Sequence, residues 1–228
     1  MIAFHYLTES MKAGCGREPA WTLGEDRTIK SKKPLVLCQR GYHSSPTAWD
    51  GLPYAPGPIL CVVEISEPEG MDVTEHEAKY VSRTRKLVAF VNIEKELRQF
   101  AIDCAERALL REREHGREPD ARFWAAIEAA KAFLRGEITP EELAAAYTAT
   151  YASAYACASV SAYVATAAYA SATAAYATAY ASAAYAAATA AYASAARDAA
   201  RDAERQWQRD HFNSLVQPRI DAMLEVGV

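Results

Sequence analysis

The chain has 228 residues, of which 51% are hydrophobic and 24% are charged, and its formal net charge is −4. This length allows one large domain or two. The small excess of acidic residues gives no general attraction to nucleic acid or to an anionic membrane surface, so neither kind of partner is expected.

The cysteines favour a reducing compartment. The five of them lie singly along the chain, with no Cys-x-x-Cys spacing. The first residues, MIAFHYLTES, lack the basic start and apolar core of a secretory signal peptide. We therefore expect a cytoplasmic protein. Cys38 and His43 offer at most two closely spaced metal ligands, so no metal or other cofactor is expected.

Residues 1–91 are predicted to form a small, β-rich mixed domain. Short apolar or β-branched runs alternate there with Gly, Pro and charged turns. The Ser45-Pro46 step is a good helix opening and predicts one short helix. The predicted strands are Met1–Tyr6, Leu35–Cys38, Ile59–Ile65 and Lys86–Val91.

From Asn92 onward the apolar residues recur with a helical period. Asn92 can cap a first helix that ends before Gly116. A second helix is predicted from about Asp120 to Arg135 and is closed by Gly136. Because the loop between them is short, residues 92–138 are predicted to form an antiparallel helical hairpin.

A third helix has the clearest start in the sequence, Thr139-Pro140-Glu141-Glu142. Thr139 can cap it, Pro140 fits the first helical position, and Glu142 can return a hydrogen bond as in a capping box. Pro218 is the predicted stop, so the helix would cover residues 139–217 and leave 218–228 as a tail. Such a helix is about 115 Å long at 1.5 Å per residue.

Most of this third helix is an uncharged Ala/Tyr run. The 54 residues from Leu143 to Ala196 contain 29 Ala and nine Tyr, and no charge, Gly or Pro. Ala is the strongest helix former, but Ala, Ser and Thr are too weakly apolar to predict a membrane span. On a straight helix the tyrosines occupy an arc of about 200°, and small residues fill the rest.

A face of small residues allows another backbone to approach closely, and Tyr rings add buried area. We therefore predict that the Ala/Tyr run drives homo-oligomerisation as a helical bundle, because a lone uncharged helix would aggregate. The predicted fold class is α+β: a small mixed β-rich domain, a helical pair and a very long helix in an oligomeric bundle. The tyrosines expected in the oligomer are Tyr147, Tyr151, Tyr155, Tyr169, Tyr176 and Tyr180.

Three residues raise an enzymatic alternative. His5, a central tyrosine such as Tyr54 or Tyr42, and Glu64 follow one another in an order that resembles the His-Tyr-Glu series of ADP-ribosyltransferases. The resemblance would assign Glu64 to a ribose hydroxyl and Tyr54 to stacking on nicotinamide. The competing interpretation is that His5 is a satisfied, buried polar residue and Glu64 a charge at a strand edge.

The stretch from Val36 to Glu64 carries a Cys, a Gly-Tyr-His step, a short Pro-containing helix, and a Tyr before an apolar strand. This order resembles an uncharacterised domain carried by many phage and prophage proteins, and the resemblance covers about residues 1–95. That domain usually has Phe where this chain has Tyr. The candidate binding residues in this stretch are Tyr42, His43 and Trp49.

The stretch from Phe100 to about Glu142 is similar to a family of immunity proteins associated with bacterial polymorphic toxins. The similarity rests on Cys104-Ala-Glu-Arg107, Pro119-Asp-Ala-Arg122 and Arg135-Gly-Glu-Ile138. The family implies a protein that binds and neutralises a partner such as a toxin or a defence protein. The Ala-rich region departs from the family pattern, since it is longer, spaced by Tyr and uncharged.

The sequence therefore favours a non-enzymatic, oligomeric binding protein of phage or prophage type, acting as an immunity or counter-defence protein by sequestering a partner. It leaves two alternatives open. One is an ADP-ribosyltransferase-like enzyme on an oligomeric helical stalk, and the other is a structural spacer or filament subunit.

Overall fold

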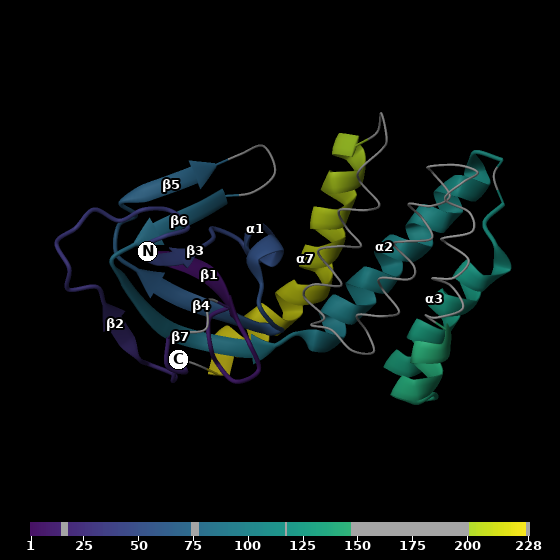
Figure 1. Ribbon diagram of the computed structural model, residues 1–228, viewed down its shortest axis with the longest axis horizontal. Helices are drawn as coiled ribbons and strands as arrows, with labels where there is room; N and C mark the ends of the chain where they lie inside the picture. The colour runs from purple at the N-terminus through teal and green to yellow at the C-terminus, as the bar shows by residue number, and fades with distance from the viewer. Residues whose placement is uncertain (15–17, 74–77, 117, 147–200, 227–228) are drawn as a thin grey trace. The chain divides into compact units, whose positions relative to one another are not determined.

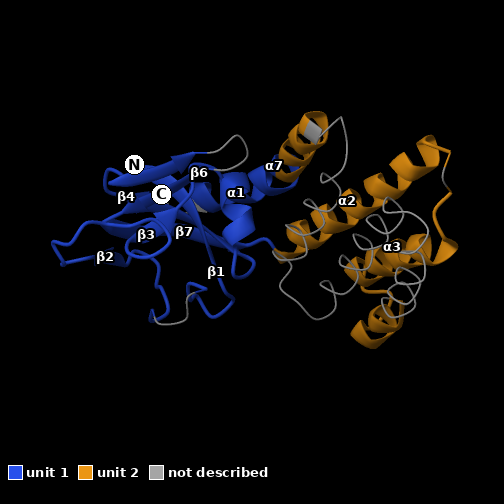
Figure 2. Ribbon diagram, turned by 45° about the horizontal axis from the view of Figure 1, so that its top comes forward, with its two compact units in different colours: residues 1–93, 213–228 blue, residues 94–212 orange. Residues whose placement is uncertain are grey.

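The computed structural model describes residues 1–14, 18–73, 78–116, 118–146 and 201–226 (Figure 1). The fold is α+β, and the chain divides into two compact units. The N-terminal unit comprises Met1–Ile93 and Asn213–Val228, and the helical unit comprises Glu94–Phe212 (Figure 2). The Ala/Tyr run from residue 147 onward lies outside the described residues, and with it the six tyrosines expected in the oligomer.

The N-terminal unit contains two antiparallel sheets. The larger has the strand order β1-β4-β7-β2, and the smaller has the order β3-β6-β5. β4 pairs with β1 on one side and β7 on the other, which explains its nearly unbroken apolar sequence. The strands are β1 Ile2–Leu7, β2 Asp26–Thr28, β3 Tyr42–Ser44, β4 Ile59–Ile65, β5 Gly70–Val73, β6 Ala78–Ser82 and β7 Thr84–Asn92.

One face of the larger sheet carries a buried apolar cluster. Ala3 and Leu7 of β1 lie in it together with Cys61 of β4 and Leu87 of β7. Because side chains alternate between the two faces of a strand, His5 shares the face of Ala3 and Leu7. The sheet therefore presents a histidine on the same face as its apolar core.

Backbone hydrogen bonds join the smaller sheet to the larger one. Phe4 of β1 and Ser45, just after β3, exchange two hydrogen bonds of 2.8 Å each. At the other end only Arg83 separates β6 from β7. These two links hold β3 and β6 beside β1, where the candidate site lies.

The predicted short helix is confirmed as α1, Ala48–Gly51, which continues into the 3-10 turn η1, Leu52–Tyr54. Thr47 caps it, because its Oγ1 accepts a hydrogen bond from the Asp50 backbone N–H at 3.1 Å. The same hydroxyl donates to Asp50 Oδ2 at 2.6 Å. The cap therefore lies two residues later than the Ser45-Pro46 step suggests.

Both helices of the predicted hairpin are present, as α2, Glu94–Glu114, and α3, Ala121–Leu134, which lie side by side (Figures 1 and 2). Each ends before a glycine in the left-handed region, Gly116 with φ +75° and Gly136 with φ +74°. Asp120 caps α3 by accepting the Arg122 backbone N–H at 2.8 Å.

The capping box at the start of the third helix is also confirmed. The Thr139 backbone N–H donates to Glu142 Oε2 at 2.8 Å, and the Glu142 N–H donates to Thr139 Oγ1 at 3.2 Å. The helix is described over residues 140–146, and its predicted continuation lies outside the described residues.

The strand predicted at Leu35–Cys38 is wrong. The chain makes a tight turn there instead, in which Val36 and Arg40 exchange two backbone hydrogen bonds of 2.8 Å. Cys38 has φ +62°, which a strand does not allow. The chain reverses within four residues, so the apolar run is too short to reach a neighbouring strand.

The helix stop predicted at Pro218 is also wrong, because α7, Arg201–Val226, passes through this proline. Val216 and Ile220, on either side of it, are both buried, and their burial favours the continued helix. Pro218 is exposed and, because it has no backbone N–H, it cannot donate the usual helical hydrogen bond to the carbonyl of residue 214. Among the helices described, none is long and apolar enough to cross a membrane.

Gly41 holds the turn after Cys38, and its replacement should be costly. Its φ is +136°, and a Cβ there would lie 2.0 Å from Val81 Cγ2. We expect Gly41→Ala to lower the free energy of unfolding by about 2–4 kcal/mol, from backbone strain and steric overlap together. Urea unfolding of the full chain measures this loss.

Gly24→Ala is the matched control, because Gly24 has φ +80° with no atom within 4 Å of the added Cβ. Strain alone should then cost about 1 kcal/mol. Equal losses for the two variants would contradict a tightly packed turn at Gly41.

Candidate functional site

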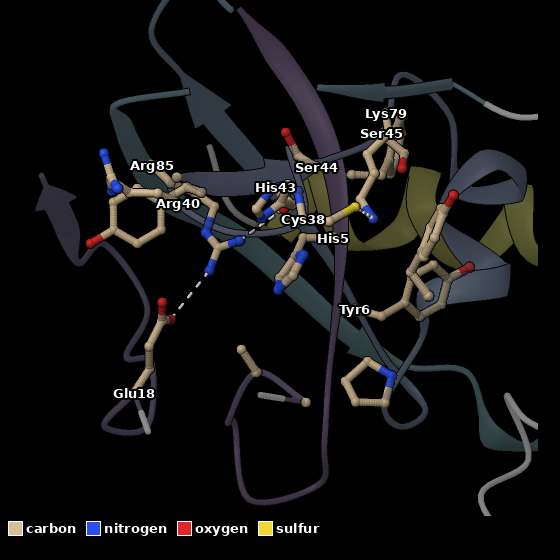
Figure 3. Close-up of a pocket in the computed structure, with 18 of the residues that line it drawn as sticks. His5, Tyr6, Glu18, Cys38, Arg40, His43, Ser44, Ser45, Lys79 and Arg85 are labelled. Atoms are coloured by element: carbon tan, nitrogen blue, oxygen red, sulfur yellow. Dashed lines mark hydrogen bonds and ion pairs between the residues drawn. The ribbon is translucent and has the colours of Figure 1, made fainter. Parts of the chain in front are cut away.

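The N-terminal unit contains a cavity of about 620 Å³ (Figure 3). Its walls come from β1, the turn at 38–41, β3, the 3-10 turn η1, and single residues of β6 and β7. The chemistry-bearing side chains that line it include His5, Cys38, His43, Tyr54, Lys79 and Arg85. Segments that are far apart in the sequence therefore form one site within this unit.

His5 supplies a neutral imidazole at the centre of the cavity, into which its ring points (Figure 3). Burial lowers its pKa well below the ordinary value of 6.5, and the charge of Arg85 and the proximity of His43 lower it further. A hydrogen bond to the His43 backbone opposes this lowering. Nε2 is buried and has no hydrogen-bond partner among the described residues. Because the other ring nitrogen donates to that backbone, Nε2 is left as an acceptor.

His43 is held neutral as well. Its Nε2 accepts a hydrogen bond from the Cys38 backbone N–H at 2.8 Å, which requires an unprotonated nitrogen. Burial, followed by the charges of Lys79 and Arg85, lowers the pKa of His43 from 6.5 to about 4. At neutral pH this ring therefore braces the turn at Cys38 and carries no charge.

Lys79 brings a cation to the same wall. Its Nζ lies 3.5 Å from the centre of the Tyr54 ring and donates to Cys38 Sγ at 3.4 Å. Cys38 is an exposed, free cysteine. The three residues place an ammonium group, an aromatic ring and a thiol at one end of the cavity.

Arg85 is the buried cation of the site, with 2% of its side chain exposed. Its Nη1 donates to the His43 carbonyl at 3.0 Å, and its Nη2 lies 3.7 Å from Glu18 Oε2. The guanidinium also lies 4.4 Å from the centre of the Trp21 ring. Burial lowers the pKa of Arg85 to about 10, with Glu18 opposing, so it stays charged at neutral pH.

The structure brings His5 and Tyr54 into the cavity but does not bring Glu64 to them. Cys61 pairs with His5 across β1 and β4, whereas Glu64 lies three residues further along β4. An odd separation places their side chains on opposite faces of the sheet. Glu64 is exposed there, so the His-Tyr-Glu set is not assembled around one site.

Of the three candidate binding residues, Tyr42 and His43 line the cavity, and Trp49 on α1 does not. Sequence reasoning missed Lys79 and Arg85. Arg85 lies two residues before Leu87, so the alternation of side chains along β7 places both on its buried face. This spacing could have indicated a buried cation. No cluster of three or more His, Cys, Asp or Glu suited to a metal ion occurs in the described part of the chain.

The helical unit contains a buried carboxylate, that of Glu204 on α7, which has no exposed surface. It accepts hydrogen bonds from Arg107 Nε at 2.8 Å and Gln208 Nε2 at 3.1 Å, and Arg111 Nη2 lies 3.0 Å away. The arginines come from α2, so this charge cluster fastens α2 to the start of α7. Two cations and an amide compensate one buried anion.

Next to the Glu204 carboxylate lies a partly exposed group of three residues, Arg107, Trp207 and His211, here called the Trp207 cluster. The rings of Trp207 and His211 stack at 4.8 Å with an interplanar angle of 15°, and the Arg107 guanidinium lies 4.3 Å from the Trp207 ring. His211 Nε2 is 2.7 Å from Asp103 Oδ2. Glu204 thus holds Arg107 of the Trp207 cluster in place, and Asp103 holds His211.

The low pKa of His43 makes the N-terminal unit sensitive to acid. Between pH 6.5 and about 4, the unfolded chain binds a proton at this residue and the folded chain does not. The free energy of unfolding should therefore fall as the pH falls from 6.5 towards 4. An NMR titration should place the His43 midpoint near pH 4, with signals assigned from His43→Gln, and that variant should lose less stability over this range. A midpoint near 6.5 would contradict the assigned environment.

Removal of the Glu204 carboxylate should destabilise the helical unit. Glu204→Ala leaves Arg107 and Arg111 without their anion, and because both are partly exposed we expect a loss of about 3 kcal/mol. Glu128→Ala is the matched control, since Glu128 is 64% exposed where it pairs with Lys131 and should cost less than about 0.5 kcal/mol. Thermal unfolding followed by circular dichroism compares them. Similar losses would show that the buried cluster adds little.

Comparison with protein families concerns the helical part of the chain. A family described as "Imm-5 like putative immunity protein" matches residues 92–215, which is more than half of the 228 residues. The match coincides closely with the helical unit, Glu94–Phe212, and confirms the predicted similarity to immunity proteins. The comparisons with curated proteins and with solved structures found no match. The chain therefore belongs to the Imm-5 like family of immunity proteins.

Proposed function

We propose that this protein neutralises a bacterial toxin by binding to it through the helical unit. The observation that carries the proposal is the coincidence of the family match, residues 92–215, with one compact unit, Glu94–Phe212. The partner is then a protein, and its sequestration needs no chemical step.

The Trp207 cluster is the part of the described helical unit best suited to such contact. Trp and Arg are the residue types that most often dominate protein interfaces. Trp207 is stacked on His211, and Arg107 is held by the buried Glu204, so neither side chain loses much freedom on binding. The cluster is partly exposed, with 36% of the Arg107 side chain accessible. It is a preorganised aromatic and cationic patch.

The proposal includes three further expectations from the sequence. The protein is of phage or prophage type, as the resemblance of residues 1–95 implies, and it acts in the cytoplasm, which its single cysteines favour. The Ala/Tyr run drives homo-oligomerisation, which would present several copies of the helical unit to the toxin. The third expectation rests on composition, since 29 of 54 residues are Ala and no charge interrupts them.

The toxin-binding proposal is tested by screening the intact chain against toxin domains of bacterial polymorphic toxins. Co-expression should rescue growth, and surface plasmon resonance should detect the complex. Trp207→Ala should weaken binding by roughly 30-fold or more, as expected for an interface anchor that contributes about 2 kcal/mol.

Trp124→Ala is the matched control, because Trp124 on α3 also carries a stacked arginine, Arg113, at 4.6 Å. It should change the affinity less than about threefold. Thermal unfolding checks that both variants fold. If no toxin domain binds the intact chain, the proposed function is wrong. If both tryptophans matter equally, the Trp207 cluster is not the contact surface.

The oligomer is tested by light scattering on the full chain. We expect a mass that is a multiple of the 24.9 kDa protomer. Replacing Tyr147, Tyr151 and Tyr155 by Ala should shift the mass towards the protomer, because the run loses buried aromatic area. A protomer mass for the unaltered chain would contradict the oligomer.

A further inference from the structure

The cavity of the N-terminal unit is not explained by toxin binding. It lies wholly within residues 4–85, before the family match begins at residue 92. Its volume of about 620 Å³ falls within the range of about 300–1,000 Å³ that is usual for small-molecule sites. This is far more space than a single inorganic ion needs. The cavity has the dimensions of an organic ligand site.

The charges around the cavity favour an anion. Arg40, Lys79 and Arg85 line it, and Glu18 is the one carboxylate among its described lining residues. Glu18 lies 3.7 Å from Arg85, so Arg40 and Lys79 add positive charge that no lining carboxylate balances. The whole chain has a net charge of −4, which makes this local excess of cations distinctive.

Two more features restrict the chemical class of the ligand. Tyr42 and Tyr54 place aromatic rings in the lining. Lys79 Nζ occupies one face of the Tyr54 ring, so a flat heterocycle would contact the remaining aromatic surface of the two tyrosines. His5 points into the cavity with Nε2 buried and without a partner among the described residues (Figure 3). A neutral histidine whose other nitrogen donates to the backbone offers Nε2 as an acceptor, so it matches a hydroxyl donor. The site combines an anion contact, a hydroxyl contact and a stacking surface.

We propose that this cavity binds a nucleoside phosphate. Lys79 and Arg40 hold the phosphate, the His5 Nε2 accepts a hydrogen bond from a sugar hydroxyl, and the tyrosine rings contact the base. Among the described residues Arg40 donates from Nη1 to the Pro34 carbonyl at 2.9 Å, and its remaining N–H groups can meet the phosphate. Arg85 keeps its contacts with the His43 carbonyl and Glu18 and forms part of the cavity wall without binding the phosphate.

The test is isothermal titration calorimetry of the full chain with AMP, adenosine and inorganic phosphate. AMP should bind at least about tenfold more tightly than either fragment, because it alone engages all three contacts. Lys79→Met should weaken AMP about tenfold or more, since it removes one charge-assisted hydrogen bond. Lys86→Met is the matched control, because Lys86 is an exposed β7 lysine outside the cavity, and AMP binding should stay within about twofold.

His5→Leu removes the acceptor and should also weaken AMP, provided that circular dichroism shows a native fold. If it does not fold, Lys79→Met alone decides the question. The proposal is overturned if AMP does not bind up to about 5 mM, if inorganic phosphate binds as well as AMP, or if Lys79→Met leaves AMP binding unchanged. None of these outcomes bears on toxin binding, which is measured separately.

Discussion

The buried guanidinium of Arg85 is the interaction on which the N-terminal unit depends. An ion removed from water needs several compensating contacts, and Arg85 finds them in the His43 carbonyl, Glu18 and the Trp21 ring. Those contacts tie β7 to β3 and to the segment before β2. Burial lowers the pKa of His5 and of His43, and the positive charge of Arg85 lowers both pKa values further, so both rings are neutral at neutral pH. One buried cation thus holds the cavity wall together and adds to the effect of burial on the protonation state of its two histidines.

The helical unit also contains a buried ion, but in this unit the ion is an anion, the carboxylate of Glu204. Glu204 is surrounded by Arg107, Arg111 and Gln208, and the arginines reach outward from it. Compensation is complete at the carboxylate, and the partly exposed Arg107 then stacks on Trp207. The internal charge therefore holds a surface side chain in place. One arginine therefore belongs to both the buried charge cluster and the partly exposed Trp207 cluster.

Local signals in the sequence predicted local structure well. The Thr139 capping box and the glycines after α2 and α3 were confirmed because each depends on a few adjacent residues. The strand Ile59–Ile65 was exact, since a central strand is apolar along its length. By contrast, the strands of the smaller sheet are short and polar, and only their pairing partners define them. The helix end predicted at Pro218 was wrong, because the burial of Val216 and Ile220 outweighs the one backbone hydrogen bond that the proline cannot make.

The candidate site was only half predictable for the same reason. His5, Tyr42 and His43 attracted attention through their chemistry, but Lys79 and Arg85 join them through sheet pairing between β3, β6 and β7. Glu64, in contrast, was expected near His5 but lies on the opposite face of the sheet. The order of residue types along a sequence does not show which face of a strand each side chain occupies. Spatial proximity in a β-rich unit depends on register, and one sequence alone does not give the register.

The end of the family match and the boundary between the two units both fall within α7. The match ends at residue 215, whereas Val216 and Ile220, one and five residues later, are buried side chains of the N-terminal unit. This unit is therefore built from two segments of the chain, one on each side of the helical unit in the sequence. A fragment of residues 1–93 would lack both side chains and their burial, which is worth about 1.5–3 kcal/mol for each large aliphatic group. The cavity-bearing unit is thus completed only after the whole immunity region, which lies between its two segments in the sequence, has been synthesised.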